Sequence, residues 1–164
     1  VSPITTHIPI SQINKKIGTQ KIIKKIKTIN YFYKKRINKK PVIAILGLNP
    51  HNYSASKKSE EKIIIKPAIK KIKKMKINII GPVSPDTAFV FNKKYRPDII
   101  VGMYHDQVLT PFKTIFKFNA INITLGLPYI RISPDHGVGK YITGKKIANP
   151  SSLIEAIKFF NFLK

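Results

Sequence analysis

Apolar residues recur along the chain with two different periods. Between residues 11 and 36 they stand three or four positions apart, which predicts an amphipathic helix that Ser11 can cap and that Gly18 weakens. The same spacing predicts helices over residues 59–76, where Pro67 would break or kink the helix, over residues 106–116, and over residues 150–163.

Short apolar runs alternate with these helical segments. They predict a short strand within residues 1–10 and strands over residues 41–48, 77–81, 98–105 and 120–133, the last one broken at Gly126. Strands that are apolar throughout suit a sheet covered on both faces. The sequence therefore predicts the α/β class, with α/β/α layers and a mostly parallel sheet, in which ligands collect at the carboxyl ends of the strands.

Charge adds a second possibility. The chain has 31 basic and 7 acidic residues among 164, a net charge of +24, which would attract polyanions and leaves a basic nucleic-acid-binding module as an alternative function. Only Arg36, Arg96 and Arg131 are arginines, and lysine occurs together with isoleucine and asparagine, all with A/T-rich codons. We therefore attribute the charge to codon bias, expect the aromatic residues in the core, and do not expect a nucleic-acid partner.

The composition also narrows the chemistry. The chain has no cysteine, which excludes disulfides, thiolate metal sites and cysteine nucleophiles. It has no apolar run long enough to cross a membrane and no signal peptide at its start. We expect a cytoplasmic protein without membrane contact.

Three of the four histidines follow predicted strands or the loops that end them. His7, His51 and His105 stand in "TTHIP", "GLNPH" and "GMYHD", so they can meet at one edge of the sheet. Three neutral imidazoles at one point would bind a divalent metal and leave positions open for a substrate. The alternative is three unrelated side chains, each with its own hydrogen bonds.

Other polar residues follow the same edge. Asp106 could orient His105, accept a proton or cap a helix, and Arg131 is a bidentate anion ligand or a surface charge. Asn122 either contacts an anionic substrate or completes a turn. The loop 135–150 contains three glycines and leads into a helix N-terminus, which favours either an anion site or a simple connection; it lacks the GxGxxG pattern.

Longer motifs carry a family resemblance. At "TTHIPI", "GLNPH", "GPVSPDTAF", "MYHDQVLTPFK" and "NITLGLPYIRISPDHG" the chain resembles the 4-hydroxythreonine-4-phosphate dehydrogenases of pyridoxal phosphate biosynthesis. The resemblance covers essentially all of residues 1–164 and corresponds to the C-terminal half of that family. It implies an isocitrate/isopropylmalate dehydrogenase-like fold and a homodimer with a shared active site.

The resemblance also implies residue roles. The metal ligands would be His7, His51 and His105, from both subunits, and the substrate ligands would be Lys113, Asn122 and Arg131. Asp86 and Asp106 would be the acidic residues near the metal, with a role in proton transfer. The cofactor contacts would be His136, Gly137 and Asn149. The implied reaction is oxidation of 4-phosphohydroxy-L-threonine by NAD with a divalent metal (zinc, magnesium or cobalt), giving a 2-amino-3-oxo acid phosphate that loses carbon dioxide.

Two departures from the family qualify this expectation. The N-terminal half is absent, and "NYSASKKSEE" follows His51 where the family has a stretch containing glycine and glutamate. We therefore expect residues 1–164 alone to be inactive. A noncatalytic remnant that keeps only the fold is a further alternative.

Overall fold

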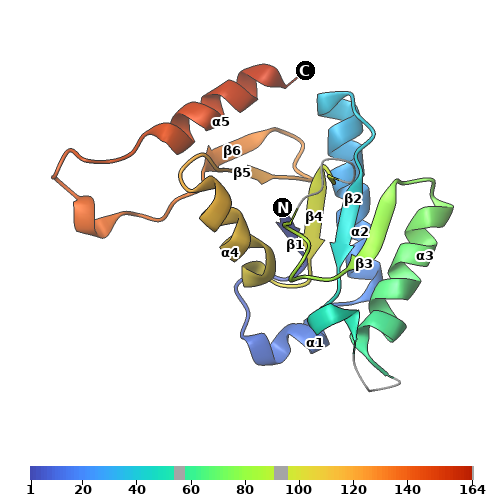
Figure 1. Cartoon of the computed structure of the whole chain (residues 1–164). Helices are drawn as coiled ribbons and strands as arrows, with labels where there is room; N and C mark the ends of the chain where they lie inside the picture. Colours follow the sequence, from blue (N-terminus) through green and yellow to red (C-terminus); the bar gives the residue numbers. More distant parts are fainter. Residues whose placement is uncertain (54–57, 91–95, 164) are drawn as a thin grey trace.

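A computed structural model gives the fold of residues 1–53, 58–90 and 96–163 (Figure 1). Its centre is a four-stranded sheet in the order β1-β4-β2-β3, and every neighbouring pair is parallel. The strands are β1 (Ser2–Pro3), β2 (Ile43–Leu46), β3 (Ile79–Val83) and β4 (Ile99–Gly102). The parallel sheet predicted from the apolar runs is confirmed.

Alternate residues of the central strands face two different helix layers. Ile43, Ile45 and Val101 belong to a core made with the isoleucines of α2 (Thr19–Phe32) and α3 (Lys66–Lys74). Ala44, Leu46 and Ile100 belong to a smaller core with Val108 of α4 (His105–Phe116). Side chains of a strand point alternately to the two faces of the sheet. Helices on both faces therefore bury the side chains of strands that are apolar throughout. The predicted α/β/α layering is confirmed.

The first helical segment is not continuous. A 3₁₀ turn (Ile10–Gln12) and α1 (Ile13–Lys16) are followed by extended Ile17 and Gly18, and only then does α2 begin; a π turn (Tyr33–Ile37) ends it. The helix predicted over 11–36, which Gly18 weakened, is therefore interrupted at residues 17–18. Ile17 is buried in the core, and this burial stabilises the extended backbone at residues 17–18 although the helical spacing of apolar residues continues through them.

The second helical segment tolerates its proline. A π turn (Glu61–Ile65) leads into α3, and Pro67 lies in the first turn of α3. Residues 60–65 are already helical, so Pro67 lies inside a continuous helical run, where a proline removes one hydrogen bond of the helix. The predicted break becomes a change from π to α geometry.

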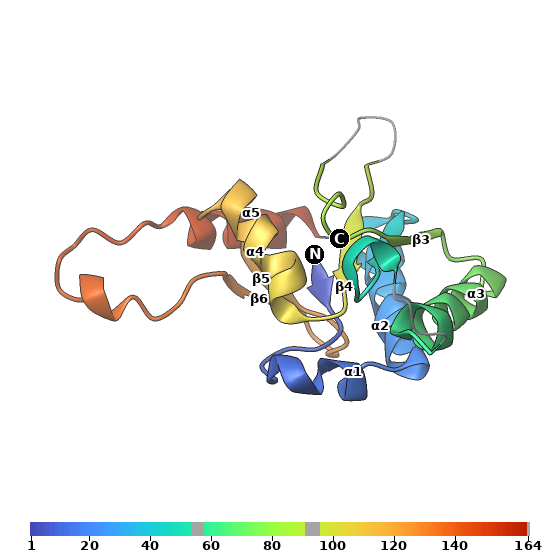
Figure 2. The same ribbon diagram turned by 60° about the horizontal axis from the view of Figure 1, so that its bottom comes forward.

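The C-terminal third is built separately. β5 (Ile121–Thr124) and β6 (Arg131–Pro134) form an antiparallel hairpin outside the main sheet, joined through Gly126 with φ +89°. Helix α5 (Ser151–Phe162) packs on this hairpin. Between them, the loop 135–150, with a 3₁₀ turn at Lys140–Ile142, extends away from the body in both views (Figures 1 and 2).

Aromatic residues do not build the core. Among the described residues, the buried hydrophobic side chains are those of isoleucine, leucine, valine, alanine and methionine. Tyr33, Phe89 and Tyr104 lie at the core margins, and eight aromatic side chains are exposed: Tyr31, Tyr53, Phe116, Phe118, Tyr129, Tyr141, Phe160 and Phe162. The expectation of an aromatic core is wrong, because branched isoleucines already fill the space between sheet and helices. None of the described helices has the length and apolarity of a membrane span.

The isoleucine core makes a direct stability prediction. Ile26 in α2 is fully buried, and its replacement by alanine leaves a cavity between helix and sheet. We expect Ile26→Ala to lower the free energy of unfolding by about 2–5 kcal/mol in urea denaturation. The matched control is Ile10→Ala, at a side chain that is 77% exposed, with an expected change within about 0.5 kcal/mol. Equal losses in both variants would contradict this core.

Candidate functional site

The carboxyl ends of three adjacent strands carry the histidine-bearing segments. β4 lies between β1 and β2, and all three run in the same direction. His7 follows β1, His105 follows β4, and His51 follows β2 after a short loop. Parallel order therefore brings the three segments to one edge of the sheet, where ligands of such folds collect.

His7 and His105 form a pair at this edge. Their ring centroids lie 5.5 Å apart, with an interplanar angle of 45°. His7 adopts a left-handed backbone with φ +51°, and His105 is the first residue of α4. His105 Nδ1 lies 2.6 Å from Asp106 Oδ1, which leaves Nε2 as the ring atom available to a cation or substrate.

His51 has a different partner. It also has a left-handed backbone (φ +54°), and its Nδ1 lies 3.2 Å from Asp86 Oδ2. The other oxygen of Asp86 accepts a hydrogen bond of 2.7 Å from the Ser84 hydroxyl. This hydroxyl, together with the imidazole of His51, holds the pKa of Asp86 below its ordinary value. Each acidic residue predicted near the metal therefore contacts one of the predicted histidines.

The three imidazoles do not form one cluster within a single chain. Over residues 1–53, 58–90 and 96–163, no three His, Asp or Glu side chains lie close enough together to hold a metal ion. The chain supplies one close imidazole pair and one separate His–Asp pair. Neutral imidazoles are suitable ligands for zinc, so the donor chemistry fits such an ion, and a third ligand would have to come from a moved His51 or from a second copy. The three-histidine site stays a prediction.

The predicted substrate ligands lie on α4 and the hairpin. Asn122 and Arg131 share one face of the hairpin, since Asn122 pairs with Ser133 and Thr124 with Arg131 in register. Arg131 Nη1 donates to Thr124 Oγ1 at 2.8 Å. Lys113 Nζ lies 3.3 Å from Asp135 Oδ2 and donates to the Asp135 carbonyl at 3.1 Å. Both cations are exposed, and Lys113 lies on α4, the helix that begins with His105.

The predicted cofactor residues lie on the exposed loop. His136 Nδ1 is 3.1 Å from the carbonyl of Gly137, and no atom lies within 4 Å of a Cβ built on Gly137. Asn149 has a local role, because its Oδ1 accepts a hydrogen bond of 2.9 Å from the Ser151 amide at the start of α5. Residues 136–150 are all exposed, and the cofactor role of this loop stays a prediction.

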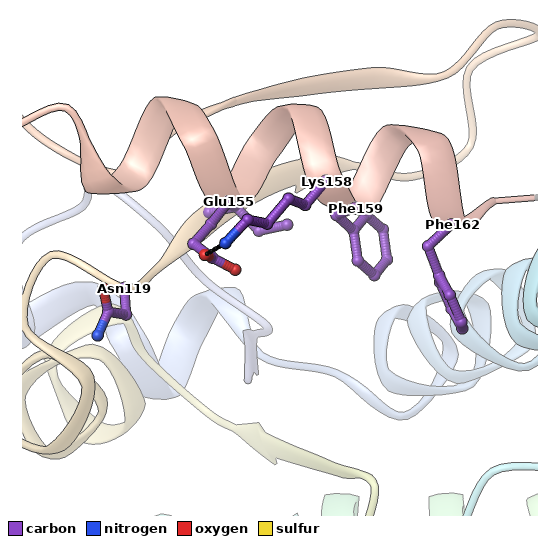
Figure 3. Close-up of a pocket in the computed structure, with 6 residues that line it drawn as sticks. Asn119, Glu155, Lys158, Phe159 and Phe162 are labelled. Carbon is purple, nitrogen blue, oxygen red and sulfur yellow. Dashed lines mark hydrogen bonds and ion pairs between the residues drawn. The ribbon is translucent and has the colours of Figure 1, made fainter.

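An open hollow of about 310 Å³ lies beside α5, away from these residues. Phe159 and Phe162 project into it from α5, and Glu155 pairs with Lys158 at its side (Figure 3). Asn119 and Ile121 complete its lining. None of the predicted site residues lines this hollow.

The residues that sequence reasoning missed are buried polar side chains behind the histidines. Glu61 is 1% exposed, and its Oε1 accepts from the amides of Leu48 (2.9 Å) and Asn49 (2.8 Å). The Asn49 side-chain amide donates to both Glu61 oxygens. A signal existed in the sequence: Glu61 falls on the stripe 61-65-68-69-72, whose other members are buried and apolar.

A close approach of backbone to side chain fixes the same loop. A Cβ built on Gly47 would stand 2.0 Å from Asn52 Oδ1, so a larger residue here would displace the Asn52 side chain. Asn52 has a left-handed backbone (φ +56°), and its Nδ2 donates to the Pro82 carbonyl at 3.0 Å. The loop that carries His51 is therefore held from both sides by buried groups.

Comparisons with known proteins give the class and then the family. The chain is similar to a solved structure named as a putative 4-hydroxythreonine-4-phosphate dehydrogenase from Salmonella typhimurium, with 34% identity and a TM-score of 0.80 over 95% of this chain and 48% of that one. It is also similar to the 4-hydroxythreonine-4-phosphate dehydrogenase from Klebsiella pneumoniae, with 32% identity and a TM-score of 0.81 over 97% of this chain and 49% of that one. A terephthalate 1,2-cis-dihydrodiol dehydrogenase from Burkholderia xenovorans LB400 shares only the fold, at 24% identity and TM-score 0.72. The fold is thus the isocitrate/isopropylmalate dehydrogenase-like α/β fold.

Sequence comparison narrows this class. Residues 1–160 match the family described as "Pyridoxal phosphate biosynthetic protein PdxA", and the chain belongs to that family. It is 50% identical to the 4-hydroxythreonine-4-phosphate dehydrogenase of Sulfurihydrogenibium sp. (strain YO3AOP1), over 100% of this chain and 51% of that protein. The Aquifex aeolicus (strain VF5) protein of the same name is 38% identical, with 98% and 50% covered. The chain spans about half the length of the curated relatives it matches.

The buried carboxylate makes a pH-dependent prediction. Burial alone would raise the pKa of Glu61, but hydrogen bonds from Asn49 and Leu48 outweigh it and hold the pKa below its ordinary value. Its contribution to stability is therefore present at neutral pH and is lost as the pH falls through the lowered pKa. We expect Glu61→Gln to lower the free energy of unfolding by about 1–3 kcal/mol in urea denaturation at pH 7, because one of the amides that donate to this carboxylate loses its acceptor.

The difference between wild type and Glu61→Gln should shrink below about pH 4, where an unperturbed Glu protonates. Glu155→Gln is the matched control, since Glu155 pairs with the exposed Lys158 at the surface of α5. A loss of the same size at pH 7 and at acid pH would contradict the role given to the Glu61 carboxylate.

Proposed function

We propose that the chain forms part of a metal-dependent, NAD-linked dehydrogenase that oxidises 4-phosphohydroxy-L-threonine in the cytoplasm, for pyridoxal phosphate biosynthesis. The observation that carries the proposal is the His7–His105 pair, with ring centroids 5.5 Å apart at the carboxyl edge of the sheet, in a chain that belongs to the PdxA family. The substrate and reaction come from relatives that are about twice as long.

The site residues take separate roles in this proposal. A divalent metal, when bound, supplies Lewis-acid polarisation of the substrate hydroxyl. His7 and His105, with His51 from the same or a second copy, would hold it. Asp106 contacts the His105 ring through Nδ1, and Asp86 does the same for His51, which leaves Nε2 of each ring as the atom for a ligand.

The cations around the hairpin suit the substrate. Arg131 and Lys113 carry positive charge on the hairpin face and on α4, as a phosphate or carboxylate requires. Asn122 on the same face as Arg131 can donate a hydrogen bond. His136, Gly137 and Asn149 would contact NAD once the loop 135–150 closes against a partner surface, and a homodimer is the assembly we propose for this.

Metal binding is the first test. We expect the full chain to bind zinc in isothermal titration, and His105→Ala to weaken the binding more than the approximately 10–100-fold lost when an outer hydrogen-bond partner is removed. His136→Ala is the matched histidine control, because its ring lies on the exposed loop, and its zinc affinity should equal that of the wild type.

Two results would contradict the metal proposal. Equal zinc affinity in wild type and His105→Ala would favour a noncatalytic remnant of the fold. Salt-dependent retention on DNA without zinc binding would favour the basic nucleic-acid-binding module, for which the exposed Tyr31 on the lysine-rich α2 offers a stacking surface.

Catalysis is the second test. In a chimera, this chain would replace the segment of the Sulfurihydrogenibium relative that it matches, and NADH formation would be followed with 4-phosphohydroxy-L-threonine. We expect the isolated chain to be inactive, the chimera to be active, and Arg131→Lys in the chimera to lose more than tenfold in kcat/KM, because lysine cannot form the bidentate contact. A folded but inactive chimera would contradict the proposed function.

A further inference from the structure

Two buried polar side chains connect the three histidine-bearing segments. Thr5 is 2% exposed and Gln107 is 9% exposed, although both stand at the rim of the sheet, beside exposed histidines. Buried polar groups of this kind are retained where all their hydrogen bonds are made, since an unpaired one is costly. Their partners therefore show what they hold in place.

Gln107 bridges two strand ends. Its Oε1 accepts a hydrogen bond of 2.6 Å from the Met103 amide, at the turn between β4 and α4. Its Nε2 donates to the carbonyl of Gly47 at 2.8 Å, directly after β2. Gln107 lies two residues after His105, and Gly47 lies four residues before His51. The neutral side-chain amide of Gln107 thus links the turn next to His105 to the loop that carries His51.

Thr5 joins the third segment to the same residue, Met103. Its Oγ1 donates to the Met103 carbonyl at 2.8 Å, and its amide donates to the same oxygen at 3.2 Å. Thr5 lies two residues before His7. Met103 is consequently held through its amide by Gln107 and through its carbonyl by Thr5.

The side-chain chemistry of Gln107 is specific. The position needs one acceptor for Met103 and one donor for Gly47 at the same time, which an amide provides and a carboxylate does not. Space is equally restricted, because a Cβ built on Gly102 would stand 2.8 Å from Gln107 Oε1 and 2.5 Å from Val108 Cγ1.

We infer that Gln107 is a positioning residue that, through Met103 and with Thr5, sets the distance between the His7 and His105 rings and the placement of the His51 loop. This inference rests on the proposed metal-dependent function. The hydrogen-bonded series Thr5–Met103–Gln107–Gly47 acts behind the imidazoles and does not touch the ligand itself. Because the three paired strands lie at fixed distances from one another, this series holds the three histidine side chains at fixed distances as well.

The experiment compares Gln107→Met with Gln20→Met in the full chain, labelled with ¹³C-histidine. Methionine has nearly the volume of glutamine but neither hydrogen bond, and Gln20 is exposed on α2. In the metal-free protein, we expect a nuclear Overhauser effect between the His7 and His105 ring protons in wild type and Gln20→Met, and its loss in Gln107→Met. Zinc affinity should fall about 10–100-fold in Gln107→Met alone.

A second variant keeps the test decisive if Gln107→Met does not fold. Thr5→Val removes the hydroxyl but keeps the shape and the backbone hydrogen bond, and should weaken the same ring contact and zinc affinity. Gln107→Glu keeps the Met103 acceptor but sets a carboxylate oxygen against the Gly47 carbonyl, so it should weaken the ring contact at least as much as Gln107→Met.

The outcomes separate the two proposals. A folded Gln107→Met or Thr5→Val that keeps both the ring contact and the wild-type zinc affinity overturns the positioning role. Loss of the ring contact in a protein whose wild type binds no zinc supports the positioning role and overturns the metal-dependent function.

Discussion

The arrangement of the site depends on the parallel pairing of β4 with β1 on one side and β2 on the other. Val101 pairs with Ser2 and with Ile45, so one residue of β4 fixes both neighbours. The strands are short, and the pairing holds because isoleucines on both faces are buried by the helix layers. Three segments distant in the sequence therefore end together at one edge.

Backbone geometry at that edge is unusual. His7, His51 and Asn52 all have left-handed backbones, a conformation that non-glycine residues adopt rarely and at a cost. The adjoining segments are held by hydrogen bonds that Thr5 and Gln107 donate and by one that the Glu61 carboxylate accepts from the Leu48 amide. Strain that is held in place by a buried network is typical of functional sites more than of connecting loops.

Four of the chain's seven acidic residues contact a histidine or Asn49, which lies two residues before His51. Of the seven in the chain, Asp86 and Asp106 contact histidines, Glu60 and Glu61 contact Asn49, and Asp135 contacts Lys113. In a chain with 31 basic residues, these carboxylates lower the positive potential around the histidines while the outer helix faces stay basic.

The sequence by itself determined the α/β layering, the buried parallel strands and the family, because apolar periodicity and long ordered motifs are local properties of the chain. It also placed the histidines after strands. Tertiary structure decided which of them meet: His7 and His105 form a pair, whereas the left-handed turn after β2 directs His51 to Asp86. The break at residues 17–18, the exposed aromatics and the roles of Thr5, Gln107 and Glu61 likewise depend on contacts between distant segments. Sequence spacing does not specify such contacts, because strand order and burial decide them.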